Sequence, residues 1–275
     1  MLALWASFAG AAAAQPSEPA PESPTPATHP SDSTSEASEQ AEEDSAKDED
    51  PRSLVVFNVR LQHADLGEGN SADFVLFRRD VAIKRPRRPG IRFATLRFDL
   101  PVGRTRIQGQ EESGLGDLYF QALNFRDLAK RFSLGSGLAF QLPTATEDQL
   151  GTGKWQVAPS LFPLRTMPKQ RALFFTRIQD FVSVAGDDDR RDLHYLQVAP
   201  TIIKLLGTKR AVLFDTEAMA DWERDGELSW KSGILFATRL GQRRAAWIKG
   251  EVPWGEHRRG DWTVRVSLAW RRGGI

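Results

Sequence analysis

The sequence predicts an all-β fold: an antiparallel transmembrane β-barrel of about twelve strands, preceded by a disordered N-terminal tail. Three observations lead to this prediction. Runs of about ten residues with alternating apolar and polar positions repeat from residue 53 to the C-terminus. The connections between these runs alternate between short and long. No apolar run reaches the ~20 residues that a membrane-spanning helix needs.

The N-terminal part divides into two segments before the barrel begins. Residues 1–15 are apolar and uncharged, and Ala12 and Ala14 stand at the −3 and −1 positions of a cleavage site before Gln15. We interpret them as a signal peptide that is cleaved, although the usual basic start is missing; an uncleaved hydrophobic helix is the alternative. Residues 16–52 hold eleven acidic and two basic residues, a net charge of −9, and they are rich in Pro and Ser. Such a segment buries too little apolar surface to fold, so it is predicted to be a disordered periplasmic linker.

The remaining residues, 53–275, form the predicted barrel domain, in which 35 basic and 25 acidic residues give a net charge of +10. Alternation over each run defines the strands, because successive side chains of a strand point to opposite faces. The predicted strands are 53–63, 73–84, 91–101, 116–125, 131–142, 154–165, 171–184, 192–204, 210–222, 227–239, 245–253 and 262–271.

The connections support a barrel because they fall into two classes. Short basic turns are expected at 85–90, 127–130, 167–170, 206–209 and 241–244. Longer loops are expected at 64–72, 102–115, 143–153, 185–191, 223–226 and 254–261. Outer-membrane barrels have short turns at the periplasmic side and longer loops outside. An even number of strands then places both ends of the barrel on the periplasmic side, as an N-terminal signal peptide requires.

One parity of each strand is expected to face lipid and the other a lumen. In residues 227–239, for example, Ile234 and Phe236 share the apolar parity, whereas Lys231 and Gly233 share the polar one. A soluble sandwich would also alternate, but charges in parity with Gly and Ser favour a water-filled lumen. The lumen-lining candidates are Asp117, Asp215, Glu217, Lys231, Arg239, Lys249, Glu251, Arg265 and Arg271. The aromatic girdles at the membrane interfaces are assigned to Trp155, Trp222, Trp230, Trp254, Trp262 and Trp270.

Two features fit the pattern less well. Asp180 takes the outward parity of its strand, and a β-bulge nearby would turn it inward. Pro159, Pro163 and Pro200 lie inside predicted strands, where each removes a hydrogen-bond donor.

Four segments carry a resemblance to a known family: LRFDLPV at 96–102, GLGDLYF at 114–120, LGSGLAFQLPTAT at 134–146 and LGTGKWQVAPSL at 150–161. In order and spacing they resemble the outer-membrane transporters of the MetA-pathway-of-phenol-degradation type. The resemblance implies an outer-membrane barrel that transports aromatic or other hydrophobic compounds, and it implies no catalytic residues. Departing from the usual pattern, the chain continues past Trp270 with RRGGI instead of ending on an aromatic residue.

The residues in these motifs can also be interpreted without the resemblance. Gly114, Gly116, Gly151 and Gly153 are expected to let the backbone turn where strands meet outer loops. Gly135 and Gly137 leave space on the luminal face for a neighbouring side chain or loop. For Asp117 two roles are open: a hydrogen-bonded structural acid, which is favoured, or a contact for the solute.

Several kinds of chemistry are not expected. The chain has no cysteine, and its four histidines, His29, His63, His194 and His257, show no metal-ligand spacing. No nucleophile elbow or phosphate loop is present, so an enzyme is not predicted. No metal, cofactor or nucleic-acid partner is expected either. The run Asp187–Asp189 could bind a divalent cation, but a solvated loop is the favoured reading.

The sequence thus favours a porin-like channel or transporter for small solutes in the outer membrane of a Gram-negative envelope. Twelve strands lie between barrels filled by side chains and open porins, so a constricted passage is expected. The expected partners are outer-membrane lipid and lipopolysaccharide, the barrel-assembly machinery and a small-molecule solute. The alternatives are a closed barrel with a structural or surface-interaction role and, less favoured, an outer-membrane barrel enzyme.

Overall fold

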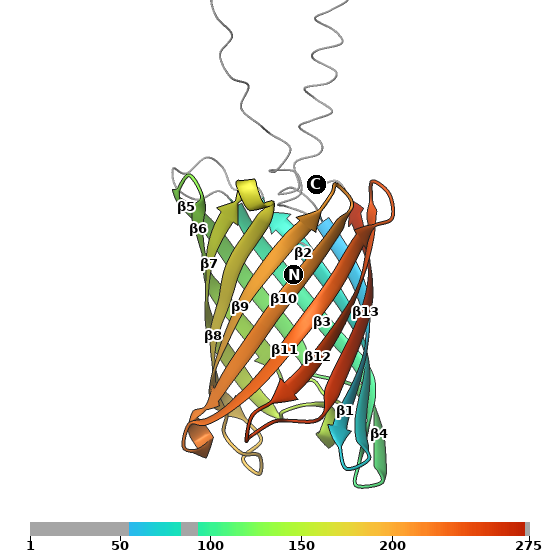
Figure 1. The fold of residues 1–275 in the computed structure, drawn as a ribbon. Coiled ribbons are helices and arrows are strands. Elements are labelled where there is room, and N and C mark those ends of the chain that lie inside the picture. Colours follow the sequence, from blue (N-terminus) through green and yellow to red (C-terminus); the bar gives the residue numbers. More distant parts are fainter. Residues whose placement is uncertain (1–54, 84–92, 273–275) are drawn as a thin grey trace, which may run out of the picture.

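The computed structural model describes residues 55–83 and 93–272, which form a closed antiparallel β-barrel (Figure 1). Neighbouring strands follow one another in the sequence, and β1 closes the barrel by pairing with β13. The strands are β1 (Val55–Gly67), β2 (Asn70–Ile83), β3 (Phe93–Ile107), β4 (Gln110–Leu115), β5 (Leu118–Ala129), β6 (Phe132–Leu142), β7 (Lys154–Met167), β8 (Ala172–Gly186), β9 (His194–Leu206), β10 (Arg210–Asp221), β11 (Glu227–Arg239), β12 (Arg244–Trp254) and β13 (Trp262–Arg272). Three short 3₁₀ helices lie in connections: η2 (Asp148–Leu150), η3 (Pro168–Gln170) and η4 (Trp222–Arg224).

Thirteen strand segments make twelve barrel positions, because β4 and β5 occupy one position. The first half of β3, Phe93–Asp99, pairs with β5, and its second half, Val102–Ile107, pairs with β4. The prediction of twelve antiparallel strands is therefore confirmed. The predicted signal peptide, the whole of the acidic tail and the turn at 85–90 lie outside the described residues. Among the described residues, no helix is long and apolar enough to cross a membrane.

The barrel has two ends, which we name by their connections. The turn end carries the β5–β6, β7–β8, β9–β10 and β11–β12 connections, the start of β1 and the end of β13, and it lies at the top of Figure 1. The loop end carries the β1–β2, β3–β4, β6–β7, β8–β9, β10–β11 and β12–β13 connections. Both termini of the barrel thus lie at the end with the short turns, as the parity of the strand count predicts.

Two of the predicted loops, 64–72 and 102–115, are instead hairpins that extend the barrel wall at the loop end. Glu68 and Gly69 turn β1 into β2 with φ values of 55° and 77°, and Gln108 and Gly109 turn β3 into β4 with 53° and 81°. Positive φ at both central residues is the type I′ geometry that matches the twist of a hairpin. The prediction of loops was wrong because strands were assigned only where one parity is apolar. These hairpins extend beyond the apolar part of the wall, where a strand needs no apolar face.

Exposure follows the predicted alternation along the strands. On β11, Ile234 and Phe236 are 48% and 58% exposed on the outer face, whereas Gly233, Leu235 and Ala237 are buried on the inner face. The same parity places an apolar surface around the barrel. Its exposed members include Phe57, Leu61, Phe77, Phe98, Leu100, Phe132, Leu138, Leu161, Phe174, Ile202, Phe214, Ile248 and Val266.

The prolines are accommodated by local gaps in the ladder. The register of β7 with β8 skips residues 158–159 and 162–163, which contain Pro159 and Pro163, and the register of β9 with β10 skips 199–200, which contain Pro200. A strand tolerates proline at a position where the ladder requires no hydrogen bond from the backbone N–H. Asp180 lies on the outer face. The irregularity in the pairing of β7 with β8 lies at Trp155/Gln156, opposite Ser183–Ala185, and it does not turn Asp180 inward, so the prediction of a bulge that does so is wrong.

Candidate functional site: the luminal wall

The inner face of the barrel carries a belt of charged residues in the middle part of the strands. Within the described residues this charged belt contains seven bases and five acids, all of inward parity. Its members are Arg60, Arg78, Asp80, Arg97, Asp99, Arg177, Asp215, Glu217, Lys231, Lys249, Glu251 and Arg265.

On β2 and β3 the belt is built from two crossed arginine–aspartate pairs. Arg78 Nε donates to Asp99 Oδ1 at 2.6 Å, and its Nη2 also reaches the second oxygen of that carboxylate. Arg97 Nε donates to Asp80 Oδ1 at 2.7 Å. The register places Arg78 opposite Asp99 and Asp80 opposite Arg97, so each cation has a carboxylate directly across the ladder. Charge-assisted pairs of this kind fix side-chain geometry as well as neutralise charge.

On β10 to β13 the belt is a chain of shared carboxylates. Lys249 Nζ lies 2.6 Å from Asp215 Oδ2 and 3.0 Å from Glu251 Oε1. Arg265 pairs with Glu251 and donates from Nε to Gln62 Oε1 at 2.7 Å. These residues come from four different strands, so the network braces the wall across the barrel closure between β13 and β1. A second part of the network joins Glu217 to Lys231, at 2.8 Å, and to Arg177.

The opposite side of the lumen, on β5 to β9, is lined mainly by neutral polar groups. Gln179 Nε2 donates to Tyr119 Oη at 3.1 Å and to Ser160 Oγ at 3.0 Å. Tyr195 Oη donates to Gln156 Oε1 at 3.3 Å, and the Tyr195 ring stacks on Phe181 with centroids 4.9 Å apart. Arg177 is the member of the charged belt that β8 contributes. We call the inner faces of β10–β13 and β1–β3 the charged arc, and those of β5–β9 the neutral arc.

Toward the turn end the inner face of β7–β13 and β1 becomes apolar. A continuous cluster of buried side chains there draws one or two residues from each of eight strands. This apolar band contains Val56, Leu164, Leu173, Phe175, Ile203, Ala211, Leu213, Leu235, Ala237, Trp247 and Ala269, with Leu205 and Ala245 packed against it. The sequence predicts that the inward parity of each strand is polar, and the apolar band is an exception to that prediction.

The structure distributes the predicted lumen-lining residues over three places. Asp215, Glu217, Lys231, Lys249, Glu251 and Arg265 all belong to the charged belt. Arg239 and Arg271 lie at the turn end, where Arg271 Nη2 donates to the Gln242 carbonyl at 2.7 Å. Asp117 lies at the loop end, between β4 and β5.

Asp117 ties down the β6–β7 connection. Its carboxylate accepts hydrogen bonds from the Thr152 N–H at 2.7 Å, the Thr152 hydroxyl at 2.9 Å, the Ala145 N–H at 3.3 Å and Gln141 Nε2 at 3.2 Å. A buried carboxylate with this many donors serves as the anchor of a loop. These contacts favour the structural role for Asp117 over contact with a solute.

The glycines around this loop serve close packing more than turning. A Cβ on Gly114 would lie 2.0 Å from Thr146 Oγ1, and one on Gly151 would lie 2.3 Å from the Ala145 Cβ. Gly153, with a φ of +69°, is the one of the four motif glycines in the left-handed region. The space over Gly135 is filled by Phe125 and Phe162, as the prediction of a neighbouring side chain required.

Six members of the charged belt were not predicted from the sequence as lumen-lining residues. They are Arg60, Arg78, Asp80, Arg97, Asp99 and Arg177. The signal was available, because the parity rule that placed Lys231 inward also places Arg97 and Asp99 inward, between the outward Leu96, Phe98 and Leu100.

Five of the six girdle tryptophans lie at or near the loop end, and Trp270 lies near the turn end. All six have outward parity or lie in a connection, and Trp155, Trp222, Trp254 and Trp262 are 40% to 50% exposed. Trp270 contacts Phe57, with centroids 6.0 Å apart.

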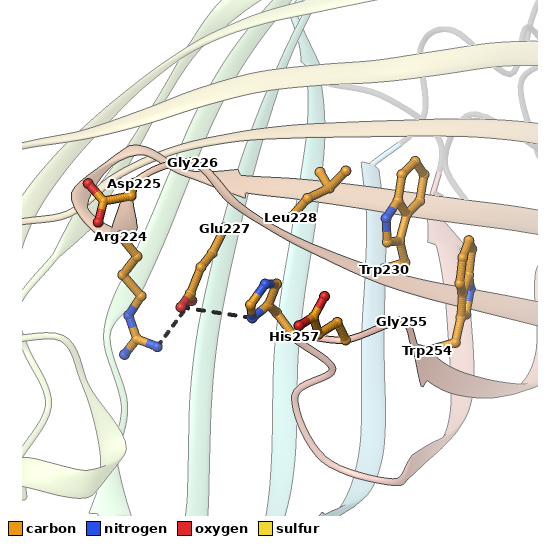
Figure 2. Close-up of a pocket in the computed structure, with 10 residues that line it drawn as sticks. Arg224, Asp225, Gly226, Glu227, Leu228, Trp230, Trp254, Gly255 and His257 are labelled. Atoms are coloured by element: carbon orange, nitrogen blue, oxygen red, sulfur yellow. Dashed lines mark ion pairs between the residues drawn. The ribbon is translucent and has the colours of Figure 1, made fainter.

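A shallow pocket of about 630 Å³ lies at the loop-end rim, between the β10–β11 and β12–β13 connections (Figure 2). Trp230 and Trp254 stack there with centroids 5.1 Å apart and ring planes 18° apart. Glu227 lies 3.6 Å from Arg224 and 3.9 Å from His257. Asp225 and Glu256 also line the pocket, so acidic side chains outnumber the single arginine there.

Two histidine–aspartate pairs lie on the outer face near the loop end. His63 Nδ1 lies 2.6 Å from Asp73 Oδ1, and His194 Nε2 lies 3.4 Å from Asp180 Oδ1. In the described part of the chain neither histidine has a hydrogen bond to a serine or threonine hydroxyl. These pairs therefore lack the nucleophile of a hydrolase triad.

The acidic run Asp187–Asp189 in the β8–β9 connection forms a turn, in which Asp187 Oδ1 accepts a hydrogen bond from the Asp189 N–H at 2.9 Å. Nearby, the Lys154 ammonium bonds to Asp192 at 3.0 Å and lowers the pKa of that carboxyl. No group of three His, Asp or Glu side chains that could hold a metal ion occurs within residues 55–83 and 93–272.

No family model and no curated protein sequence matches the chain, so the resemblance to the MetA-pathway type stays a prediction. Among solved structures, the chain is similar to the COG4313 outer membrane channel from Pseudomonas putida F1, with a TM-score of 0.68 and 11% identity over 80% of this chain and 96% of that one. The translocator domain of the autotransporter NalP from Neisseria meningitidis matches with a TM-score of 0.49 and 10% identity, covering 87% and 98% of the two chains. The KdgM porin matches with a TM-score of 0.47 and 8% identity, covering 79% and 98%. At this level of identity the first match shows a common barrel fold.

Proposed function

We propose that this protein is an outer-membrane channel for small solutes with aromatic or hydrophobic bodies. The observation that carries the proposal is the graded inner wall of a closed twelve-stranded barrel. A charged belt lies next to an apolar band, and the outer face is apolar as a lipid-facing surface must be. The similarity in fold to a solved outer membrane channel supports the same class of function.

The apolar band supports a solute with an apolar part. An ion or sugar gains nothing from an apolar constriction, and partial dewetting of such a constriction raises the barrier to its passage. An aromatic or aliphatic body would instead be favoured there, because it leaves water for an apolar surface. In this proposal the turn end faces the periplasm, and lipopolysaccharide surrounds the outer rim where the tryptophans near the loop end lie.

Location is tested by fractionation of cells that express the full-length protein. We expect it in the outer membrane, with a gel mobility that changes on heating, as closed barrels show. Recovery in the soluble periplasmic fraction would overturn the proposal at its first step.

Passage is tested by reconstitution into planar bilayers. We expect discrete conductance steps that are small for a barrel of this size, since twelve strands leave a narrow lumen. Liposome assays should show faster entry of benzamide than of a neutral sugar of similar mass.

The apolar band also favours one alternative, a closed barrel with a structural or surface-interaction role. A protein that fractionates with outer membranes but shows neither conductance nor solute entry would establish this alternative in place of a channel.

A further inference from the structure

One base of the charged belt, Arg60, differs from the six others. Arg78, Arg97, Arg177, Lys231, Lys249 and Arg265 each pair with a carboxylate. Arg60 forms no ion pair within the described residues, and its Nε is buried with no hydrogen-bond partner. All five carboxylates of the belt are already engaged by these other bases. Arg60 is therefore the one base of the charged belt that has no carboxylate partner within the described residues.

The position of Arg60 is set by a row of residues across three strands. Arg60 on β1 lies opposite Ser267 on β13, and Ser267 lies opposite Trp247 on β12. Because Ser267 between them is small, the guanidinium carbon of Arg60 can lie 4.9 Å from the centroid of the Trp247 ring. A guanidinium on an indole face is a favourable cation–π contact that leaves its edge free to donate hydrogen bonds.

More polar groups around this row lack partners. The indole Nε1 of Trp247 and the Oδ1 of Asn58, two residues before Arg60 on the same face, are both buried without a hydrogen bond. Buried polar atoms are normally paired, so three unpaired groups in one patch, two on β1 and one on β12, indicate a place where a ligand or water completes the hydrogen bonding.

The row also marks the boundary between the two zones of the inner wall. Val56 and Trp247 belong to the apolar band, whereas Arg60 belongs to the charged belt. A ligand that satisfies Arg60 needs a negative group, and the neighbouring surface favours an apolar body. A carboxylate suits the planar, bidentate fork of arginine.

We propose that Arg60, held on Trp247, binds the carboxylate of a small amphipathic anion whose aromatic or aliphatic body lies against the apolar band. The inference rests on the proposed function, since the solute must reach the lumen. It makes Arg60 a specificity-determining residue, and it makes small carboxylates with an aromatic or aliphatic body the substrate class.

The experiment measures binding of benzoate, and of its neutral analogue benzamide, to the full-length barrel in detergent by titration calorimetry. Benzoate should bind saturably and benzamide about tenfold or more weakly, since a charged hydrogen bond is lost. Arg60→Gln should weaken benzoate binding by about the same factor and leave benzamide unaffected. The matched control is Arg79→Gln, because Arg79 is exposed on the outer face of β2 and its loss should change nothing.

Equal affinity of the wild-type protein for benzoate and benzamide would overturn the inference without the use of any variant. Unchanged benzoate affinity in Arg60→Gln, with a normal heat-modifiable gel shift as proof of folding, would overturn it as well. Bilayer recordings separate this result from the proposed function. Conductance without benzoate binding removes the Arg60 site and leaves the channel, whereas benzoate binding without conductance leaves the site and removes the channel.

Discussion

The charged arc and the neutral arc of the inner wall differ in how their buried polar groups are paired. Both arcs place polar groups on the inside of a barrel whose outside is apolar. The charged arc does so with buried ion pairs that link β10 through β13 and β2 to β3, and the neutral arc does so with amides, hydroxyls and stacked rings. Ion pairs hold the wall rigidly but fail badly when one partner is lost, whereas neutral hydrogen bonds are individually replaceable. The predictions below test this difference.

The largest effect is expected from Glu251→Gln in the charged arc. Glu251 is 4% exposed and pairs with both Lys249 and Arg265, so its loss leaves buried cations short of a counter-charge. We expect the free energy of unfolding, measured by urea titration of the folded barrel in lipid vesicles, to fall by about 3–5 kcal/mol.

The counterpart in the neutral arc is Gln179→Leu, which leaves Tyr119 and Ser160 without one partner each. The expected cost is about 1–3 kcal/mol. An equal or larger loss in Gln179→Leu than in Glu251→Gln would mean that the two arcs do not differ in the way described.

The second prediction compares the outer with the inner face of one strand. Ile234→Arg places a charge on the apolar outer surface and should cost ~2–4 kcal/mol near the membrane midplane. Lys231→Arg keeps the charge that pairs with Glu217 on the inner face, and it should fold normally. The same urea titration measures both, and similar stabilities would contradict the assignment of faces.

The third prediction concerns side-chain packing on the inner face of β5–β7, within the neutral arc. Gly135→Ala would bring a Cβ to 2.7 Å from Phe125 Cε1 and 2.9 Å from Phe162 Cβ. Overpacking of this kind should cost about 1–3 kcal/mol. The control is Gly250→Ala on β12, where a Cβ would meet nothing within 4 Å, and it should leave stability unchanged within error. A tolerant Gly135→Ala would show that this part of the lumen can widen.

How much of this could be predicted from the sequence depends on how far apart the cooperating residues lie. Alternation within a strand is local, so the strand count and the inward parity of Lys249, Glu251 and Arg265 follow from it. Pairing is not local. Arg60, Ser267 and Trp247 form one row because of the register in which β1 pairs with β13 and β13 with β12, and no periodicity within a strand gives that register.

The apolar band escaped prediction for a related reason. Leu235 and Ala237 take inward parity on a strand whose other inward residues are polar, and they are easily dismissed as exceptions. Each of the other seven strands contributes a similarly small number of such residues. They form a band only when closure brings the turn-end parts of these strands together.

The smallest expected effect concerns ion selectivity, and it tests whether both arcs line one passage. Arg265→Gln in the charged arc and Gln156→Glu in the neutral arc each lower the luminal charge by one unit. Focusing of the field in a narrow lumen should make both variants less anion-selective in a bilayer reversal-potential measurement, and by similar amounts. Arg79→Gln removes a charge from the outer face and should leave the reversal potential unchanged. A shift in Arg265→Gln alone would mean that ions pass along the charged arc and that the neutral arc is closed by its own side chains.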